Sequence, residues 1–109
     1  MLASKQRLDR KQFSAFFKQG RRCHGEYLTV IFKPGLTLCA AVVVSKKVFS
    51  QAHDRNSLRR KLYGWLYELS QRGLAGTLVI IVKPVVKSLT KQQTKQKLVA
   101  EIEAATIIR

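Results

Sequence analysis

The segment Ser45–Lys61, SKKVFSQAHDRNSLRRK, leads from an apolar strand through a basic corner into a helix. Beside its one acid, Asp54, it carries six cations: Lys46, Lys47, Arg55, Arg59, Arg60 and Lys61. So many like charges close together repel one another unless a polyanion neutralises them. Lysine and arginine on a rigid strand-to-helix corner suit phosphate binding, because they displace condensed counterions. The alternative interpretation is a solvated basic face.

The whole chain, like this segment, is rich in basic residues. Its 109 residues include 21 lysines and arginines against 6 acids, a formal net charge of +15 at pH 7. Hydrophobic residues make up 46%, so the chain can bury a core and is not a disordered basic tail. A folded, strongly basic domain most often binds nucleic acid and less often an anionic membrane surface. The length fits a single domain over residues 1–109, which we expect to bind RNA because of this charge.

The sequence shows no sign of a membrane span, a signal peptide or a disulfide framework. No stretch reaches the roughly 18 uninterrupted apolar residues of a membrane span. Residues 1–20 lack the apolar core of a signal peptide, so we expect a cytoplasmic protein. Cys23 and Cys39 form no CxxC pair, which favours two reduced thiols over a disulfide or a zinc site.

A first helix is predicted to begin at Asp9 and to end at Gly20. Phe13, Phe16 and Phe17 follow i, i+3, i+4 spacing and therefore share one helical face. All three can be core residues. Alternatively, so short a helix cannot bury three phenylalanines, and one or two of them line a cleft where they stack on unpaired bases.

Two strands are predicted next, at Glu26–Lys33 and Leu38–Val44, after a basic link at Arg21-Arg22. Pro34-Gly35 separates the strands, and we expect them to pair as an antiparallel hairpin. Alternation in the first strand gives two sets, Leu28, Val30 and Phe32 against Tyr27, Thr29 and Ile31. The first set is purely apolar and is expected to face the core. The second is mixed and is expected to be partly open.

The helix after the corner is predicted to be capped by Ser50 or Asp54 and to run to about Gln71. Its apolar stripe, which we interpret as core, is Leu58, Leu62, Trp65, Leu66 and Leu69. The opposite face carries Asn56, Arg60, Tyr63 and Tyr67. Arginine and tyrosine can hydrogen-bond phosphate or sugar and stack on bases, which suits RNA. Tyrosines that rest on a surface helix without a ligand are the alternative.

The C-terminal third predicts one more strand and one more helix. Thr77–Lys83 is continuously apolar and is expected to be buried on both faces. Thr90 with Gln93 predicts a capping box and a helix over 91–105. Its docking face would be Leu98, Val99, Ile102 and Ala105. The order of elements is α-β-β-α-β-α, an α+β domain with one small mixed sheet and helices packed against it.

Signs of catalysis by side chains are missing from the sequence. The acids are spread along the chain at Asp9, Glu26, Asp54, Glu68, Glu101 and Glu103. A protein nuclease usually needs clustered carboxylates for a metal, or a nucleophile with a base, and His24 and His53 have no evident nucleophile partner. There is no glycine-rich phosphate loop. We expect no catalytic residue, no metal site and no cofactor in the protein itself.

Several motifs occur in a familiar order. Arg7-Leu8 precedes a helix with Phe13 and Phe17, which closes with Lys18-Gln19-Gly20. A strand then ends in Ser45-Lys46-Lys47. Arg55-Asn56 begins a basic helix, and Leu89-Thr90 precedes the last helix. In this order and spacing, the chain resembles the protein subunit of bacterial ribonuclease P over nearly its whole length.

Two departures from that family pattern lie at the corner. Ser57 stands where the family has the second arginine of an Arg-Asn-Arg motif. Phe49-Ser50 replaces a small turn that usually bears glycine, and the link to Arg55-Asn56 is one residue longer. The basic surface itself remains.

The resemblance implies a fold and a function. The fold would be ribosomal protein S5 domain 2-like, with a left-handed βαβ crossover, a rare exception to the right-handed rule. The function would be that of a non-catalytic subunit that assists removal of the 5′ leader from precursor tRNA. The catalytic component would be an RNA, and Mg²⁺ would be bound through that RNA. The partners would be the catalytic RNA and precursor tRNA, without DNA or membrane.

The resemblance also assigns site residues. Those for binding the catalytic RNA are Ser45, Lys46, Lys47, Arg55, Asn56, Arg59 and Arg60, and Lys61 joins them by its charge. The leader-binding cleft would use Phe13 and Phe17, and strand alternation suggests Tyr27, Thr29 and Ile31 for its sheet wall. The alternative function is that of a ribosomal-type or general structured-RNA-binding protein, which would need the charge but no leader cleft.

Overall fold

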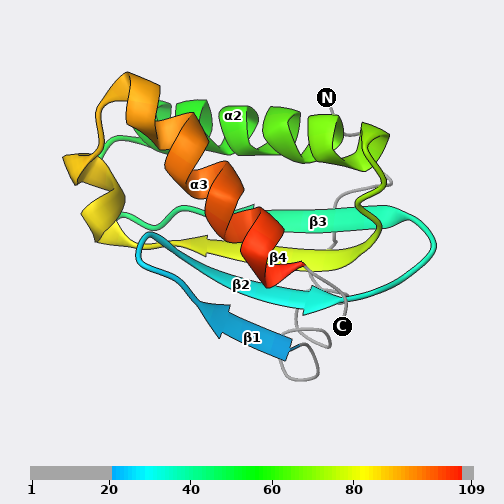
Figure 1. Ribbon diagram of the computed structural model, residues 1–109. Helices are drawn as coiled ribbons and strands as arrows, with labels where there is room; N and C mark the ends of the chain where they lie inside the picture. Colours follow the sequence, from blue (N-terminus) through cyan, green and yellow to red (C-terminus); the bar gives the residue numbers. More distant parts are fainter. Residues whose placement is uncertain (1–20, 107–109) are drawn as a thin grey trace.

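The computed structural model describes residues 21–106. The helix predicted over 9–20, with its phenylalanines, therefore lies outside the described residues. The described elements are β1 (Arg21–His24), β2 (Leu28–Lys33), β3 (Leu38–Val43), α2 (Ala52–Gln71), β4 (Gly76–Val82), the 3-10 helix η2 (Pro84–Ser88) and α3 (Lys91–Ala105). The strands form one mixed sheet, and α2 and α3 lie on the same face of it (Figure 1).

Strand β4 lies inside the sheet, whose strand order is β1-β2-β4-β3. It pairs antiparallel with β2 and parallel with β3. Leu78, Val79 and Ile80 are completely buried. A β-branched, apolar sequence fits a strand that has neighbours on both edges and packing on both faces. The prediction of a strand buried on both faces is confirmed.

The predicted antiparallel hairpin of the second and third strands is wrong. Strand β4 lies between β2 and β3 and pairs with both, so the turn at 34–37 joins two strands that are not neighbours. Proximity along the chain favoured the hairpin, but the apolar strand β4 takes the place between β2 and β3, where it has a neighbour on each edge and loses contact with water. Arg21 and Arg22 belong to strand β1, which pairs antiparallel with β2, and do not form a link.

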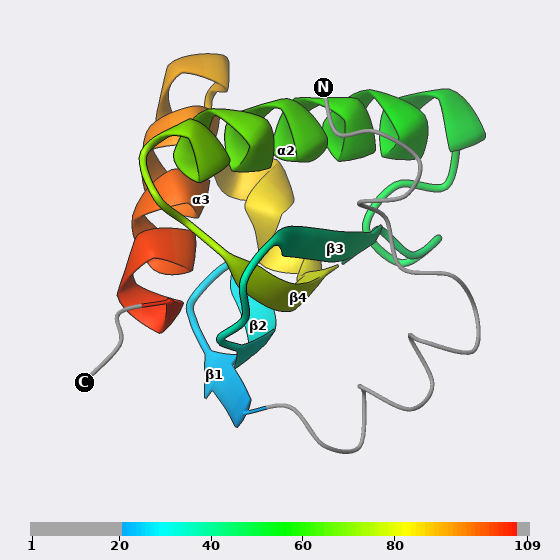
Figure 2. The same ribbon diagram turned by 90° about the vertical axis from the view of Figure 1, so that its right-hand side faces the viewer.

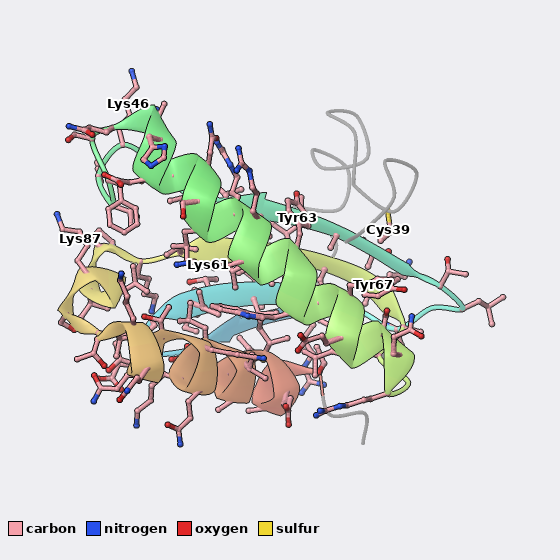
Figure 3. All side chains as sticks on the ribbon, turned by 90° about the horizontal axis from the view of Figure 1, so that it is seen from above. Cys39, Lys46, Lys61, Tyr63, Tyr67 and Lys87 are labelled. Atoms are coloured by element: carbon pink, nitrogen blue, oxygen red, sulfur yellow. The ribbon has the colours of Figure 1, made fainter. Side chains whose placement is uncertain are left out.

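The connection from β3 through α2 to β4 joins two parallel neighbours. In Figure 2, which looks along these strands, and in Figure 3, which looks down on the helices, it runs in the left-handed sense. Because β3 and β4 are parallel, the segments that follow them, 44–51 and 83–90, leave the sheet at the same end. This end of the sheet brings together basic residues that are about 40 positions apart in the sequence.

The helices pack through the predicted apolar stripes. Leu58, Leu62, Leu66 and Leu69 of α2 are buried, and Trp65 is half-buried against them. On α3, Leu98 and Ile102 are completely buried, with Val99 and Ala105 packed beside them. The capping box is also confirmed: Thr90 Oγ1 accepts from the Gln93 amide, and Gln93 Oε1 accepts from the Thr90 amide, each at 3.2 Å.

Two glycines give opposite expectations for alanine substitution. Gly76 begins β4 with φ +128°, and a Cβ there would lie 2.5 Å from the carbonyl oxygen of Lys33. Gly64 lies inside α2, where a Cβ would meet nothing within 4 Å. We expect Gly76→Ala to lower the free energy of unfolding by about 1–3 kcal/mol, and Gly64→Ala to raise it by about 0.5–1 kcal/mol. Urea titration of both variants measures this, and midpoints that shift in the same direction would contradict it.

Candidate nucleic-acid interface

A tight turn presents the two lysines of the corner to solvent. The amides of Val48 and Phe49 both donate to the Ser45 carbonyl, at 3.0 and 3.3 Å. Val48 is completely buried, whereas Ser45, Lys46 and Lys47 are exposed. The buried valine therefore anchors the turn, and the lysines project from its tip beside the start of α2, where Figure 3 shows Lys46.

Arg55 holds the corner together. Its Nη1 donates to the carbonyl oxygens of Phe49 and Ser50, both at 2.9 Å, and the side chain is half-buried. Helix α2 starts after Gln51 without a side-chain cap, so the prediction that Ser50 or Asp54 caps it is wrong. The guanidinium instead binds the two carbonyl groups just before the helix. Arg55 thus orders the backbone that presents the neighbouring cations, and its other nitrogens remain available for phosphate.

The next turn of α2 holds the most accessible arginine of the corner. Arg60 and Asn56 are exposed, and half-buried Arg59 donates through Nη2 to Asn56 Oδ1. None of these arginines, nor Lys46 or Lys47, forms an ion pair with a carboxylate in the described part of the chain. Their charge is therefore not neutralised there. We define the corner surface as Ser45, Lys46, Lys47, Arg55, Asn56, Arg59 and Arg60.

Lys61 lies apart from this surface. It is exposed on the flank of α2 that faces α3, where it lines a hollow together with Trp65 and Thr94 (Figure 3). The buried leucines of α2 separate it from Arg59, which lies on the opposite flank by helical spacing. The structure thus keeps seven of the eight predicted RNA-binding residues on the corner and the first turns of α2, and places Lys61 on another surface.

The two tyrosines predicted on the outer face of α2 differ. Tyr67 is 40% exposed. Tyr63 is half-buried against the core, and its hydroxyl accepts from the amide of Val42 in β3 at 3.2 Å. Tyr63 therefore anchors α2 to the outer strand of the sheet, and the expectation that it belongs to a solvent-facing surface is wrong.

The predicted sheet wall is not open to solvent. Tyr27, Thr29 and Ile31 are 9%, 8% and 0% exposed. Ile31 forms a second apolar cluster with Val79, on the face opposite the main core. The expectation of a partly open face is wrong: Tyr27 packs in the main core, and Ile31 is completely buried beside Val79. Phe13 and Phe17, the other predicted cleft residues, lie outside the described residues.

The surroundings of Tyr27 affect its ionisation. Burial raises the pKa of its phenol, and the carboxylates of Glu26 and Glu101 raise it further. A hydrogen bond from the phenol to the Glu26 carboxylate also favours the protonated form and raises the same pKa. Thr29 is also engaged, since its Oγ1 lies 3.3 Å from Nδ1 of His24 across the β1–β2 pair.

Neither metal-binding clusters nor membrane spans are found in the described part of the chain. Residues 21–106 contain no group of three or more histidine, cysteine or acidic side chains that could hold a metal ion. Neither α2 nor α3 has the length and apolar composition that crossing a bilayer requires. What these residues offer chemically is cationic donors on a rigid scaffold, which is suited to binding phosphate.

Comparison with known proteins gives matches in sequence. The family model described as Ribonuclease P matches residues 2–106. A ribonuclease P protein component from a Synechococcus strain is 38% identical over 69 residues, 57% of this chain and 52% of the relative. The one from Thermotoga maritima is 36% identical over 64 residues, 58% of this chain and 51% of the relative. The chain thus spans about half the length of these curated relatives.

Solved structures match the fold over more of the chain. The RNase P protein of Staphylococcus aureus superposes with a TM-score of 0.84 at 19% identity, covering 95% of this chain and 98% of the other. A mutant of that protein, described as defective in mRNA degradation, gives 0.82 at 20% identity, covering 94% and 90%. At these identities the likeness shows the fold. Because the family model spans nearly the whole sequence, the chain belongs to the ribonuclease P protein family.

Proposed function

We propose that this chain is the protein subunit of ribonuclease P in the cytoplasm. It binds the catalytic RNA and the 5′ leader of precursor tRNA and assists endonucleolytic removal of that leader. The observation that carries this proposal is the corner surface, whose arginines and lysines form no ion pair with a described carboxylate. A scaffold that already holds cations in place needs little reordering when phosphates replace the counterions.

The contribution of the protein would be electrostatic. Where the catalytic RNA meets its substrate, two sets of phosphates repel each other, and the corner surface offsets part of that repulsion. The complex then assembles with fewer Mg²⁺ ions, which the RNA would bind and which supply the chemistry of hydrolysis. The side chains position the RNA and take no part in breaking the bond.

Reconstitution with the catalytic RNA tests this function. We expect the purified chain to accelerate cleavage of precursor tRNA at low Mg²⁺ concentration, where the RNA alone is slow, and to cleave nothing by itself. An excess of bulk RNA should compete poorly with the catalytic RNA for binding to the protein. If the chain cleaves precursor without RNA, or ribosomal RNA competes as well as the catalytic RNA, the proposal is wrong.

The leader role can be tested separately through Phe17, which the family resemblance assigns to the cleft. We expect Phe17→Ala to weaken binding of a precursor with a long leader by about 1–3 kcal/mol, because one base loses its stacking partner. Affinity titrations of the assembled complex with long-leader and leaderless tRNA measure this. An equal loss for both substrates, or no loss for either, would contradict a leader contact at Phe17.

A further inference from the structure

Two adjoining hollows lie between α2 and the segment formed by η2 and the start of α3. Their volumes are about 460 and 300 Å³, and both are lined by Lys61, Leu89 and Thr94. Lys87 lines the larger hollow and Lys91 the smaller one. We call the two together the lysine groove, after Lys61, Lys87 and Lys91.

The topology explains why lysines from three elements meet here. The parallel pairing of β3 and β4 sends η2 out of the sheet at the end where α2 begins, so Lys87 comes to lie opposite the first turns of α2 (Figure 3). The capping box at Thr90 then fixes the start of α3 and with it Lys91. Lys61 completes the set from the facing flank of α2.

The charge of the groove is unbalanced. Its three lysines are exposed, and none forms an ion pair with a carboxylate among the described residues. The one acid that lines it is Asp54. One turn further along α3, Lys95 does pair with Glu68 of α2, at 3.2 Å. The two helices thus neutralise each other beyond the groove but leave an excess of positive charge within it, which an anion would relieve.

The floor of the groove is apolar and partly aromatic. Leu58 and Val86 are buried beneath it, and the rings of Phe49 and Trp65 are half-buried at its sides. A half-exposed indole can stack on a base. Phosphate-binding lysines beside a stacking ring are what an unpaired nucleotide strand requires.

We propose that the lysine groove binds a single-stranded segment of RNA through its phosphates, as a second contact surface besides the corner surface. This inference rests on the proposed function, since the strand would belong to the same RNA assembly. The buried leucine stripe of α2 separates the two surfaces. An RNA that binds both holds α2 from its two flanks, and its strand passes around the beginning of the helix.

The test uses a charge-reversal variant and a matched control. Lys87→Glu/Lys91→Glu changes two groove residues, and Arg72→Glu/Lys97→Glu makes the same change in net charge at exposed positions outside the groove. The affinity of the full chain for the catalytic RNA is measured between 50 and 200 mM salt. We expect the loss of affinity over this range to be about tenfold smaller for the groove variant than for the control, because about two phosphate contacts are absent.

Fluorescence gives a second measurement, because Trp65 is the single tryptophan of the chain. Its emission should change when wild-type protein is saturated with the catalytic RNA, and should not change in Lys87→Glu/Lys91→Glu. The inference is overturned if the groove variant keeps the salt dependence of the control, or if wild-type emission does not respond. In either case, the proposed function stands as long as the wild-type protein still binds the catalytic RNA. If the wild-type protein shows no preference for the catalytic RNA over bulk RNA, the proposed function itself is wrong.

Discussion

Charge reversal in Arg59→Glu/Arg60→Glu lowers the affinity for the catalytic RNA by about 100-fold at physiological salt, if the corner surface binds RNA as proposed. A hydrogen bond to a charged group contributes about 1.5–3 kcal/mol, so the loss of two such phosphate contacts costs at least about 3 kcal/mol. Each 1.4 kcal/mol is a factor of about ten in affinity. Titration of labelled RNA with each protein measures the difference.

The fold should survive this change. Arg60 is exposed, and the recorded partner of Arg59 is Asn56 on the same helix surface, so no buried group loses a hydrogen bond. Arg72→Glu/Lys97→Glu is again the control with equal net charge, and its affinity should fall much less. If both double variants bind equally well, long-range attraction of a basic protein explains the binding, and the corner surface has no special role.

Arg55 differs from Arg59 and Arg60 because its guanidinium also holds the backbone of the corner. The sequence did not predict this second role. The sequence indicated the cations of the corner, because their spacing and order are local, but it also assigned to them Lys61, which lies on the other flank of α2. It could not assign Arg55 to the carbonyl groups of Phe49 and Ser50, since that role depends on the backbone path before α2. One signal was available in the sequence. Gln51, the residue just before α2, is not a type that caps a helix well, so another group has to bind the backbone at this end.

The same limit applies to the sheet. Periodicity predicted the strand content of β2, β3 and β4, and β4 was correctly predicted to be buried on both faces. Pairing depends on which strand lies between which neighbours, and chain proximity favoured a hairpin of β2 and β3 that β4 prevents by lying between them. The lysine groove was missed for a related reason. Lys61 and Lys87 are distant in sequence, and only the parallel pairing of β3 and β4 brings their elements to one end.

Glu101 of α3 is the polar residue whose replacement we expect to destabilise the connection between β1 and β2. Its carboxylate accepts from the amide of Tyr27 at 3.0 and 3.2 Å and from the amide of Leu28 at 3.0 Å. Beside it, Lys83 Nζ donates to the carbonyl of Gly25, where a Cβ would collide with the Glu101 side chain. The helix thus fixes the connection between β1 and β2 by supplying the acceptor that the turn lacks.

Replacing Glu101 by alanine should lower the free energy of unfolding by about 2–6 kcal/mol, because two amides at a buried strand end lose their acceptor and each costs about 1–3 kcal/mol. Glu101→Gln keeps one acceptor oxygen, so we expect its free energy of unfolding to fall by about half as much as in Glu101→Ala. Glu103→Ala is the matched control, since Glu103 is exposed on the same helix and its carboxylate has no recorded partner among the described residues.

Urea titrations of the three variants distinguish a hydrogen-bonding role from a general effect of charge or helix propensity. Removing either acid raises the net charge of the chain by one, so Glu101→Ala and Glu103→Ala have the same net charge. Equal midpoints for these two variants would therefore show that the amides of Tyr27 and Leu28 gain nothing from the carboxylate. A domain of this size has only about 5–15 kcal/mol of net stability, so the expected loss would leave the sheet edge at β1 and β2 close to unfolding.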